Sequence, residues 1–283
     1  SFMDMKTMKR QAIYESEDIK ITQDVLDGSP SVIVFFSNFK EADWQAIAGR
    51  EDNIRFRGHS AVFVSAKTNH WWQIPDLQEM CACIRSMTEG YAERISYGSS
   101  MGGYGALLLS SDIASTRVLA VAPQSIISDP DVPLEPAWAE AIAQRPILRD
   151  NVAESMRVVP EILYDPHMAR DLRHVDELKS RVTVEELRFP YGGHKLLNTL
   201  KECGILRDVV SRLFQGKATE EELLSIYDPV KRSSASYVFN VAQALVIAGE
   251  YDTAEQELAT LDELDPTLAA SLRSVIERRK AKA

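Results

Sequence analysis

Short runs of β-branched and aromatic residues alternate along the chain with longer segments whose apolar residues recur at helical spacing. This alternation is typical of parallel strands joined by crossover helices, so the sequence predicts an α/β fold. An opening hairpin is expected over 12–16 and 19–25. Further strands are expected over 31–36, 61–65, 94–97, 118–122, 161–164 and 182–189. The runs SVIVFF and RVLAVA are apolar throughout, which suits strands covered on both faces.

The segments of helical period predict helices over 42–48, 76–89, 103–111, 137–145, 168–179 and 198–214. After the strand expected over 118–122, a polar and proline-rich stretch, 128–136, interrupts the alternation. Such an excursion is either a lid over a site or a plain surface loop. Its run Asp-Pro-Asp-Val-Pro is more typical of a loop.

Beyond Gly216 no strand pattern occurs, and the chain is helical and charged to its end. We therefore expect a first domain over 1–216 and an all-helical extension over 217–283. The extension resembles a single tetratricopeptide unit, a helical hairpin whose small residues let two helices pack closely. The residues that carry this resemblance are Ala242, Gly249, Tyr251, Ala254, Leu258, Leu261 and Pro266.

An isolated repeat of this kind cannot bury its own apolar face. The hairpin is therefore expected to dock on the first domain, on a helix over 220–227, on a second copy of the chain or on a protein partner. A structural cap is favoured over a peptide-binding module, because such modules are built from arrays of repeats.

An excess of acidic residues, 42 Asp and Glu against 32 Lys and Arg, gives a formal charge of -10. This charge repels phosphate backbones and anionic lipids, so neither a nucleic acid nor a membrane is an expected partner. The sequence contains no run of about 18 apolar residues, so no membrane span is predicted. Cys81, Cys83 and Cys203 lack metal-ligand spacing and are expected to be reduced thiols, which predicts no metal site and a cytoplasmic location.

The segment ISYGSSMGGYG, residues 95–105, contains G-x-S-x-G between an expected strand and an expected helix. A nucleophile on such a tight turn has strained backbone angles, and the residues two positions away on either side must be of glycine size. Ser100 meets this condition through Gly98 and Gly102, whereas Ser99 has a tyrosine and a methionine at those positions. The sequence therefore predicts Ser100 as a nucleophile.

At GSSMGGYGA the chain resembles the α/β-hydrolase family, whose nucleophile elbow has this form in many bacterial esterases. The resemblance implies a mostly parallel central sheet with helices on both faces, followed here by the helical extension. It also implies a serine hydrolase that needs no cofactor. Other uses of a glycine-rich turn are not supported, because no Lys-Ser or Lys-Thr follows the glycines as in a P-loop and a Rossmann G-x-G-x-x-G is absent.

A nucleophilic serine needs a base and an acid that orients the base, which the family supplies in the chain order Ser, Asp, His. His194 follows the last expected strand on a glycine-containing loop, where the family has its catalytic histidine; a solvated loop histidine is the alternative. Asp165 directly follows the strand expected over 161–164 and is favoured as the acid. Asp171 competes with it, although a carboxylate near a helix start also stabilises the helix.

The resemblance also implies an oxyanion hole of backbone N–H groups, one after the nucleophile and one from the loop after the third strand. Those groups belong to Met101 and to the region of Asn38 and Phe39, whose loop lacks the HGGG run of lipase-type esterases. Trp71 and Trp72 follow a strand, at the same end of the sheet as the nucleophile. Their rings are expected either to line a substrate pocket or to pack a loop onto the core.

The leading hypothesis is a carboxylesterase-like or thioesterase-like serine hydrolase that acts on a small acyl substrate through an acyl-enzyme. An acyltransferase would use the same residues, since only the acceptor of the acyl group differs. The alternative from another class is a non-catalytic interaction protein, in which a hydrolase scaffold presents a docking surface. The glycines that flank Ser100 argue against it, because a chain without catalysis has no physical need for them.

Overall fold

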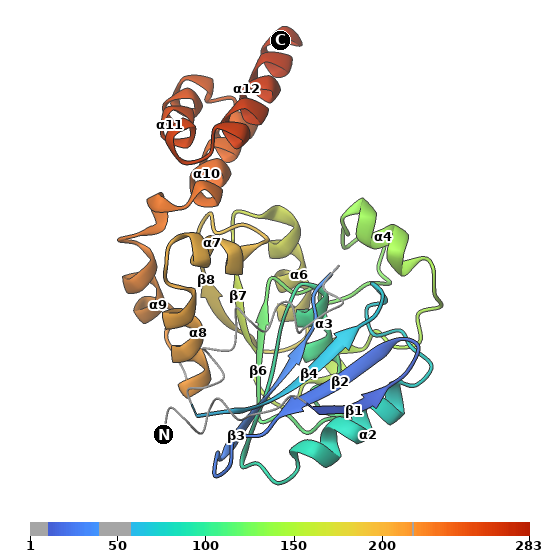
Figure 1. The fold of residues 1–283 in the computed structure, drawn as a ribbon. Helices are drawn as coiled ribbons and strands as arrows, with labels where there is room; N and C mark the ends of the chain where they lie inside the picture. Colours follow the sequence, from blue (N-terminus) through green and yellow to red (C-terminus); the bar gives the residue numbers. More distant parts are fainter. Residues whose placement is uncertain (1–10, 40–57, 217) are drawn as a thin grey trace. The chain divides into compact units, whose positions relative to one another are not determined.

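The computed structural model describes residues 11–39, 58–216 and 218–283, and Figure 1 shows their arrangement in helices and strands. The chain forms two compact units. The first comprises Ser1–Leu163 and Arg170–Glu186, and the second comprises Tyr164–Ala169 and Leu187–Ala283. The domain boundary that the sequence suggests after Gly216 stays a prediction.

Among the described residues, eight strands form one sheet in the order β1-β2-β4-β3-β5-β6-β7-β8. They are β1 (Gln11–Glu15), β2 (Ile19–Asp24), β3 (Ser31–Phe36), β4 (Ser60–Ala66), β5 (Glu93–Ser99), β6 (Arg117–Val121), β7 (Glu161–Tyr164) and β8 (Glu185–Arg188). The pairs β1–β2 and β2–β4 are antiparallel, whereas the pairs β4–β3, β3–β5, β5–β6 and β6–β7 are parallel. The sheet is therefore mostly parallel, which confirms the predicted fold class.

The strands β7 and β8 are parallel as well. The N–H of Glu185 donates to the carbonyl of Pro160, and the N–H of Phe189 donates to the carbonyl of Tyr164, so both chains advance in the same direction. The predicted strands agree with the structure to within two residues except here, since β8 begins later than the expected 182–189. The N–H of Val182 still donates to Leu178 at the end of the preceding helix, and it is not available to the sheet.

Every side chain of β3 and β4 is buried. Because successive side chains of a strand point to opposite faces, both faces of the sheet are covered at its centre, as the apolar run SVIVFF predicts. The helices that follow these strands in the chain are α2 (Leu77–Thr88), α3 (Met101–Leu108), α4 (Pro136–Ile142), α5 (Val152–Ser155) and α6 (Ala169–Lys179). The short α5 is not predicted, and the helix expected over 42–48 lies outside the described residues.

The single helix predicted over 198–214 is wrong. The structure has two helices there, α7 (Leu196–Glu202) and α8 (Leu206–Gln215). Gly204 separates them with a φ of 76°, a left-handed conformation that glycine adopts without steric cost. The N–H of Gly204 donates to Lys201 and that of Ile205 donates to Leu200, the bonding pattern that ends many helices. The apolar period continues across this break, so periodicity alone does not reveal it.

The chain after residue 217 is helical, as predicted, and the described residues there contain no strand. Its helices are α9 (Glu220–Tyr227), α10 (Ala235–Ile247), α11 (Tyr251–Leu264) and α12 (Pro266–Ala281). Thr219 and Glu222 form a reciprocal capping box at the start of α9. Small and apolar side chains that α10, α11 and α12 bury include Ala242, Val246, Ala254, Leu258, Leu261, Ala269, Leu272 and Ile276. The resemblance to one tetratricopeptide unit remains an expectation.

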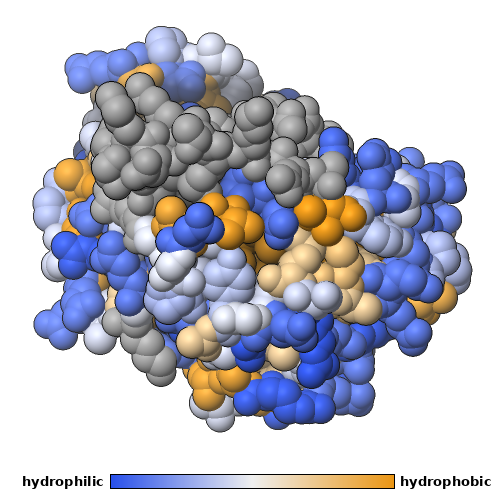
Figure 2. Space-filling model, turned by 60° about the horizontal axis from the view of Figure 1, so that its bottom comes forward, coloured by the Kyte–Doolittle hydropathy of each residue, from blue (hydrophilic) through white to orange (hydrophobic). Residues whose placement is uncertain are grey.

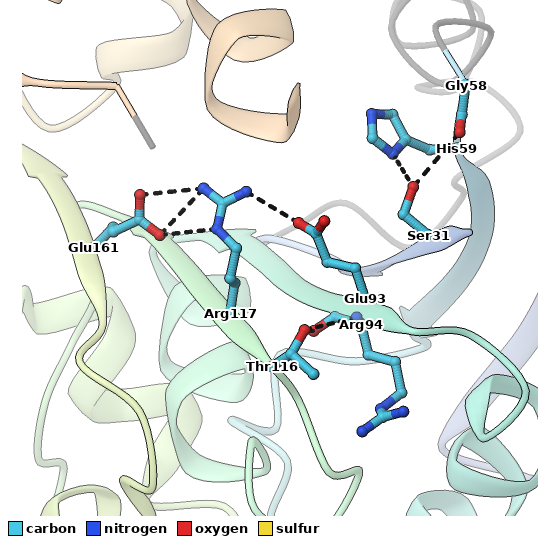
Figure 3. Close-up of polar contacts among 8 residues, drawn as sticks. All are labelled: Ser31, Gly58, His59, Glu93, Arg94, Thr116, Arg117 and Glu161. Atoms are coloured by element: carbon cyan, nitrogen blue, oxygen red, sulfur yellow. Dashed lines mark hydrogen bonds and ion pairs between the residues drawn. The ribbon is translucent and has the colours of Figure 1, made fainter. Parts of the chain in front are cut away.

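The amino ends of the central strands are joined by polar side chains (Figure 3). Arg117, at the start of β6, forms ion pairs with Glu161 of β7 and Glu93 of β5, each at 3.2 Å. On β3, the hydroxyl of Ser31 lies 2.6 Å from the Nδ1 atom of His59. Glu161 is only 2% exposed, so loss of Arg117 would leave a buried carboxylate without its main partner. This end of the sheet is held by ion pairs and hydrogen bonds, whereas Ser100 lies at the carboxyl end of β5.

Hydrophobic and hydrophilic residues are interspersed on the face shown in Figure 2. The exposed large hydrophobic residues of the described chain are Ile13, Val25, Ile147, Leu148, Val159, Ile247 and Leu264. Apart from the neighbours Ile147 and Leu148 they are isolated along the sequence, and single exposed residues of this kind are normal on protein surfaces. No helix in the described ranges is long and apolar enough to cross a membrane.

Candidate active site

Ser100 occupies the turn that joins β5 to α3. Its φ of 54° and ψ of -115° lie outside the regions that residues with a side chain favour. Such a conformation costs on the order of 1–3 kcal/mol and clusters at functional sites, where the surrounding structure imposes it. The N–H of Ser100 donates over 2.8 Å to the carbonyl of Val121, the last residue of β6. The turn is thereby fixed to the neighbouring strand.

Gly98 and Gly102 are both required by space, as the sequence suggests. A Cβ atom on Gly98 would overlap the carbonyl group of Gly102, and a Cβ atom on Gly102 would overlap the carbonyl oxygen of Phe36. Real Cβ atoms do not approach backbone this closely, so the backbone would have to shift. The two glycines therefore let the first turn of α3 lie directly against the ends of β5 and β3.

Gln124 contacts the Ser100 hydroxyl, a contact that the sequence does not predict. Its side chain is fully buried beyond the end of β6, and its Nε2 atom donates to Ser100 Oγ over 3.2 Å. The Oε1 atom accepts from Trp71 Nε1 over 2.9 Å. An indole N–H only donates, so this contact fixes which end of the amide faces Ser100. The available signal was its position: a polar residue three places after the end of β6, the strand that borders β5.

Trp71 and Trp72 are both completely buried. They lie in a turn where both residues have positive φ, and His70 stabilises this turn by accepting the Trp72 N–H at Nδ1 and binding the Asp18 carbonyl through Nε2. Trp72 donates through Nε1 to the Met101 carbonyl. Trp72 thus packs the loop onto α3, whereas Trp71 reaches Gln124. A role of either ring in binding substrate stays a prediction.

Trp71 is the centre of a group of aromatic rings. The ring of Phe39 lies 5.6 Å from it, and the ring of Trp138 lies 6.3 Å from it. Trp138 comes from α4, which follows the excursion over 128–136, and the guanidinium of Arg170 lies 5.8 Å from its ring. The excursion therefore leads to a helix that packs on the turn beside Ser100.

The chain after Gln124 is held by the buried side chain of His174 and the half-buried side chain of Asp150. His174 of α6 accepts the Ser125 N–H at Nδ1, and its Nε2 atom lies 3.0 Å from the Pro133 carbonyl. Asp150 accepts the backbone N–H groups of Ile127 and Ser128, the Ser128 hydroxyl and the Tyr104 hydroxyl. Both ring nitrogens of His174 are therefore engaged in holding this segment, which argues against a role as general base.

The residues predicted for the oxyanion hole lie at the same edge of the sheet. Met101 is the first residue of α3, and the first N–H groups of a helix have no partner within it. The loop after β3 approaches this turn, because Gly102 packs on the backbone of Phe36 and Ser37. In the structure the N–H of Phe39 donates to the Asn38 side-chain oxygen over 2.7 Å. An oxyanion bound to that N–H would have to displace the Asn38 side chain.

In the second unit, Asp165 holds the loop that leads to His194. Its side chain follows β7 directly and is 1% exposed. The Oδ1 atom accepts the N–H groups of His167 and Tyr191, at 2.8 and 3.0 Å, and Oδ2 accepts that of Gly193 at 2.9 Å. Burial raises the pKa of the Asp165 carboxyl above its ordinary value, while these backbone hydrogen bonds act in the opposite direction.

The competing acid, Asp171, lies in the first turn of α6 and is also 1% exposed. It belongs to the first unit, as do Ser100 and Gln124, whereas Asp165 and His194 belong to the second. The structure thus brings Ser100 together with Gln124 and the first turn of α3, and it brings Asp165 together with the backbone of the His194 loop.

Within the described ranges, no three or more His, Cys, Asp or Glu side chains are grouped as metal ligands. The three cysteines, Cys81, Cys83 and Cys203, are free thiols, as predicted. Burial raises the pKa of Cys81 to about 12 and that of Cys203 to about 11, so neither is a reactive thiolate at neutral pH.

No protein-family model matches the sequence, and no curated protein matches it either. Solved structures do share its fold. Carboxyl esterase 2 from the fungus Tuber melanosporum has a TM-score of 0.51 at 14% identity, over 73% of this chain and 84% of that one. Dienelactone hydrolase from Anabaena variabilis has a TM-score of 0.50 at 10% identity, over 77% and 98%.

A capsule O-acetyltransferase of Neisseria meningitidis serogroup A also matches, with a TM-score of 0.49 at 14% identity, over 72% of this chain and 94% of that one. Identities this low show the fold alone. Together with the strand order and the parallel pairing, the comparison with the esterase and the dienelactone hydrolase establishes that the chain has the α/β-hydrolase fold.

Proposed function

We propose that the chain is a serine hydrolase that cleaves an ester or thioester, with Ser100 as nucleophile, His194 as general base and Asp165 as the acid. The observation that carries the proposal is the conformation of Ser100, a strained residue between β5 and α3. The strain is maintained by two glycines that nothing larger can replace. A turn that merely connected a strand to a helix would not need this backbone conformation.

The chain order of the three residues supports the same proposal. Ser100 follows β5, Asp165 follows β7, and His194 follows β8 after a short loop. These strands run parallel, so their carboxyl ends lie at one edge of the sheet, where ligands of open parallel sheets bind. The order Ser, Asp, His is the one found in α/β-hydrolases.

In the proposed acylation step, Ser100 Oγ attacks the substrate carbonyl carbon while its proton passes to His194. The carbonyl oxygen becomes an oxyanion. It is stabilised by the N–H of Met101 and by an N–H from the loop of Asn38 and Phe39. The intermediate then collapses, the bond to the alcohol or thiol breaks, and the leaving group takes the proton from His194. The acyl group remains as an ester of Ser100.

Deacylation repeats these steps with water. His194 removes a proton from a water molecule, whose oxygen attacks the acyl-enzyme carbonyl carbon. The bond from that carbon to Ser100 Oγ then breaks, the carboxylic acid leaves, and the proton from His194 restores the Ser100 hydroxyl. No cofactor or metal takes part in this proposal. If an acceptor alcohol reached the acyl-enzyme in place of water, the same groups would perform acyl transfer.

Gln124 has a defined part in this mechanism. Its Nε2–H group donates to the lone pairs of Ser100 Oγ, leaving the hydroxyl proton to point toward a base. As the proton leaves, negative charge accumulates on Oγ, and a hydrogen bond to a charged oxygen is stronger than one to a neutral oxygen. Because Trp71 orients the amide in advance, little reorganisation is needed during the reaction.

The choice of Asp165 over Asp171 rests on the contacts of its carboxylate. An ionised carboxylate has about four lone-pair positions, and the backbone N–H groups of His167, Tyr191 and Gly193 occupy three. The remaining position on Oδ2 is beside Gly193, the residue that precedes His194. An imidazole N–H at that position would be oriented by a carboxylate that is already rigidly held.

We expect the substrate to be a small acyl compound and the enzyme to act in the cytoplasm, where its free cysteines stay reduced. A nucleic acid or membrane partner is not expected for a chain of charge -10. A second copy of the chain or a protein partner would bind the C-terminal helices. The competing class, a non-catalytic interaction protein, would retain the fold without a reactive serine.

Labelling with a fluorophosphonate probe tests the proposal. The wild type and Ser99→Ala are expected to label, and Ser100→Ala is not. Hydrolysis of p-nitrophenyl esters of increasing acyl length should follow the same ranking and define the acyl size. Persistent labelling of Ser100→Ala, or equal loss in both variants, would remove the nucleophile assignment. A wild type that neither labels nor hydrolyses any ester would favour the interaction protein.

A further inference from the structure

The loop before His194 is held by side chains that lie far along the chain. From the carbonyl of Pro190 to the N–H of Gly193, every backbone polar group has a partner within the second unit. Asp165 and Thr199 supply some of these partners. Two others come from the C-terminal helices, Tyr227 of α9 and Asn240 of α10.

Asn240 contacts the loop at two residues. Its Nδ2 atom donates to the carbonyl of Tyr191 over 2.9 Å. The same atom lies 2.6 Å from the position that a Cβ atom on Gly193 would occupy. Gly193 therefore needs to be glycine for two reasons, its φ of 79° and the presence of Asn240. Gly193, immediately before His194, thus leaves the space that the Asn240 side chain of α10 occupies.

Tyr227 and Tyr237 complete the contact between the C-terminal helices and the loop. The Tyr227 hydroxyl donates to the Pro190 carbonyl over 3.0 Å, and its ring is fully buried. The Tyr237 ring lies edge-on to Tyr227 at 6.0 Å and to Tyr191 at 6.2 Å. We name Tyr227, Tyr237 and Asn240 the C-terminal bracket.

The loop that the bracket holds is strained. Tyr191 has a φ of 61°, which costs on the order of 1 kcal/mol or more for a residue with a side chain. Its ring is stacked on His167 at 4.0 Å and is contacted edge-on by Tyr237. A strained residue stays in place only where its surroundings over-determine it. The bracket supplies part of that restraint, and Asp165 supplies the rest.

The bracket is itself anchored close to His194 on the other side. Glu202, at the end of α7, accepts the Ser234 hydroxyl at 2.7 Å and the Ser236 N–H at 2.9 Å. These groups form the start of α10, where a helix favours a negative charge. Because α7 begins shortly after His194, α10 is attached to the chain both before and after this histidine.

From this geometry we infer that the C-terminal helices position His194 for the reaction, and that Asn240 is the positioning residue through which α10 does so. The inference rests on the proposed function. It makes the activity of Ser100, in the turn after β5, dependent on helices that supply no reacting group. A displacement of about 1 Å in a catalytic group is enough to cost on the order of a hundredfold in rate.

The test compares variants of the full chain. Asn240→Ala removes the donor, and Asn240→Asp retains the shape but places a carboxylate against the Tyr191 carbonyl. Tyr227→Phe keeps the ring and removes only the hydroxyl. The control is Gln243→Ala, an exposed residue on the same helix. Two readouts are measured: kcat and KM for a p-nitrophenyl ester, and hydrogen exchange of the peptide 189–195.

We expect kcat to fall about tenfold to a hundredfold in Asn240→Ala, further in Asn240→Asp and less in Tyr227→Phe, with KM changed by no more than about twofold. Exchange at Tyr191 and Gly193 should accelerate in the same order, and the control should match the wild type in both readouts. Unchanged exchange in Asn240→Ala overturns the inference whether or not the wild type is active. Accelerated exchange with unchanged kcat overturns it too, because the loop would then be held without any consequence for turnover.

A wild type without esterase activity would instead refute the proposed function. The exchange measurement still separates the two failures in that case, since it does not depend on turnover.

Discussion

The side-chain amide of Gln124 donates to the hydroxyl of Ser100 over 3.2 Å, and the indole of Trp71 holds that amide from its other end. The three side chains come from three different connections of the sheet, after β6, after β5 and after β4. All three are at most 2% exposed. In such surroundings a hydrogen bond to a developing charge is worth more than in water, so the amide is expected to affect rate more than binding.

Gln124→Glu tests this effect directly. Glutamate preserves the size and the bond from Trp71, but it presents a carboxylate oxygen where Ser100 now receives a donor. Two negative charges about 4 Å apart repel by several kcal/mol at the effective dielectric of a protein site, so kcat should fall about a hundredfold or more. Gln124→Leu should cost roughly tenfold in kcat and also lower stability by about 1–3 kcal/mol, because the buried Trp71 N–H loses its acceptor. Equal kcat values for Gln124→Glu and the wild type would remove the assigned role.

Asp165→Asn and Asp171→Asn distinguish the two candidate acids. Asp165→Asn is expected to lower turnover by up to ~10⁴, because an amide leaves the imidazole in the wrong tautomer, and Asp171→Asn should cost far less. The structure adds a second effect. Since both carboxylate oxygens accept loop N–H groups, the amide also weakens the loop, and Asp165→Asn should unfold at lower urea concentration. The reverse ranking in turnover would transfer the role to Asp171.

The turn of Ser100 can be predicted from the sequence because its steric constraint is local. Gly98 and Gly102 lie two residues from Ser100, and the space they vacate is needed by the turn itself and by the adjacent end of β3. The strands can be predicted for a similar reason, because the residues of a strand such as β3 are buried on both faces and are therefore apolar in a continuous run. Local steric and burial requirements determine the types of residues that are close together in the sequence, so a short segment is enough to predict them.

The contacts of Gln124 and Asn240 cannot be predicted from short segments of the sequence. Trp71 lies 53 residues before Gln124, and Tyr191 lies 49 residues before Asn240. Each pair meets only because the sheet order and the helix packing bring distant segments together. No sequence pattern around a glutamine after a strand, or around an asparagine on a helix, predicts which residue it will contact. The break at Gly204 differs, because its signal is present in the sequence but the continuing apolar period masks it.

Gly102→Ala should destabilise the protein markedly. Its Cβ atom would overlap the Phe36 carbonyl oxygen, which belongs to the buried strand β3 and has little room to move. We expect a loss of about 3 kcal/mol in the free energy of unfolding, at the upper end for an overpacked interior. Gly90→Ala is the matched control, because nothing lies within 4 Å of its added Cβ. Urea unfolding of both variants measures the difference; similar midpoints would show that α3 adjusts without strain.

His70 is expected to make stability depend on pH. Burial lowers its pKa to about 4 from 6.5, because the ring is 2% exposed and a charge there would be desolvated. Below pH 6.5 the unfolded chain takes up a proton that the folded chain refuses until about pH 4. The stability from the neutral ring is therefore complete above pH 6.5 and is lost as the pH falls, by about 3 kcal/mol in all.

The variant His70→Gln isolates this contribution. It should be less stable than the wild type at pH 7.5, since the bonds to the Trp72 N–H and the Asp18 carbonyl are disturbed. Because glutamine does not titrate, the difference between the two proteins should shrink by about 2 kcal/mol at pH 5. Urea unfolding at the two pH values measures this change. A stability difference that stays constant with pH would mean that His70 is protonated as readily in the folded protein as in the unfolded chain. The assignment of a neutral His70 ring beside the Trp71–Trp72 turn would then be wrong.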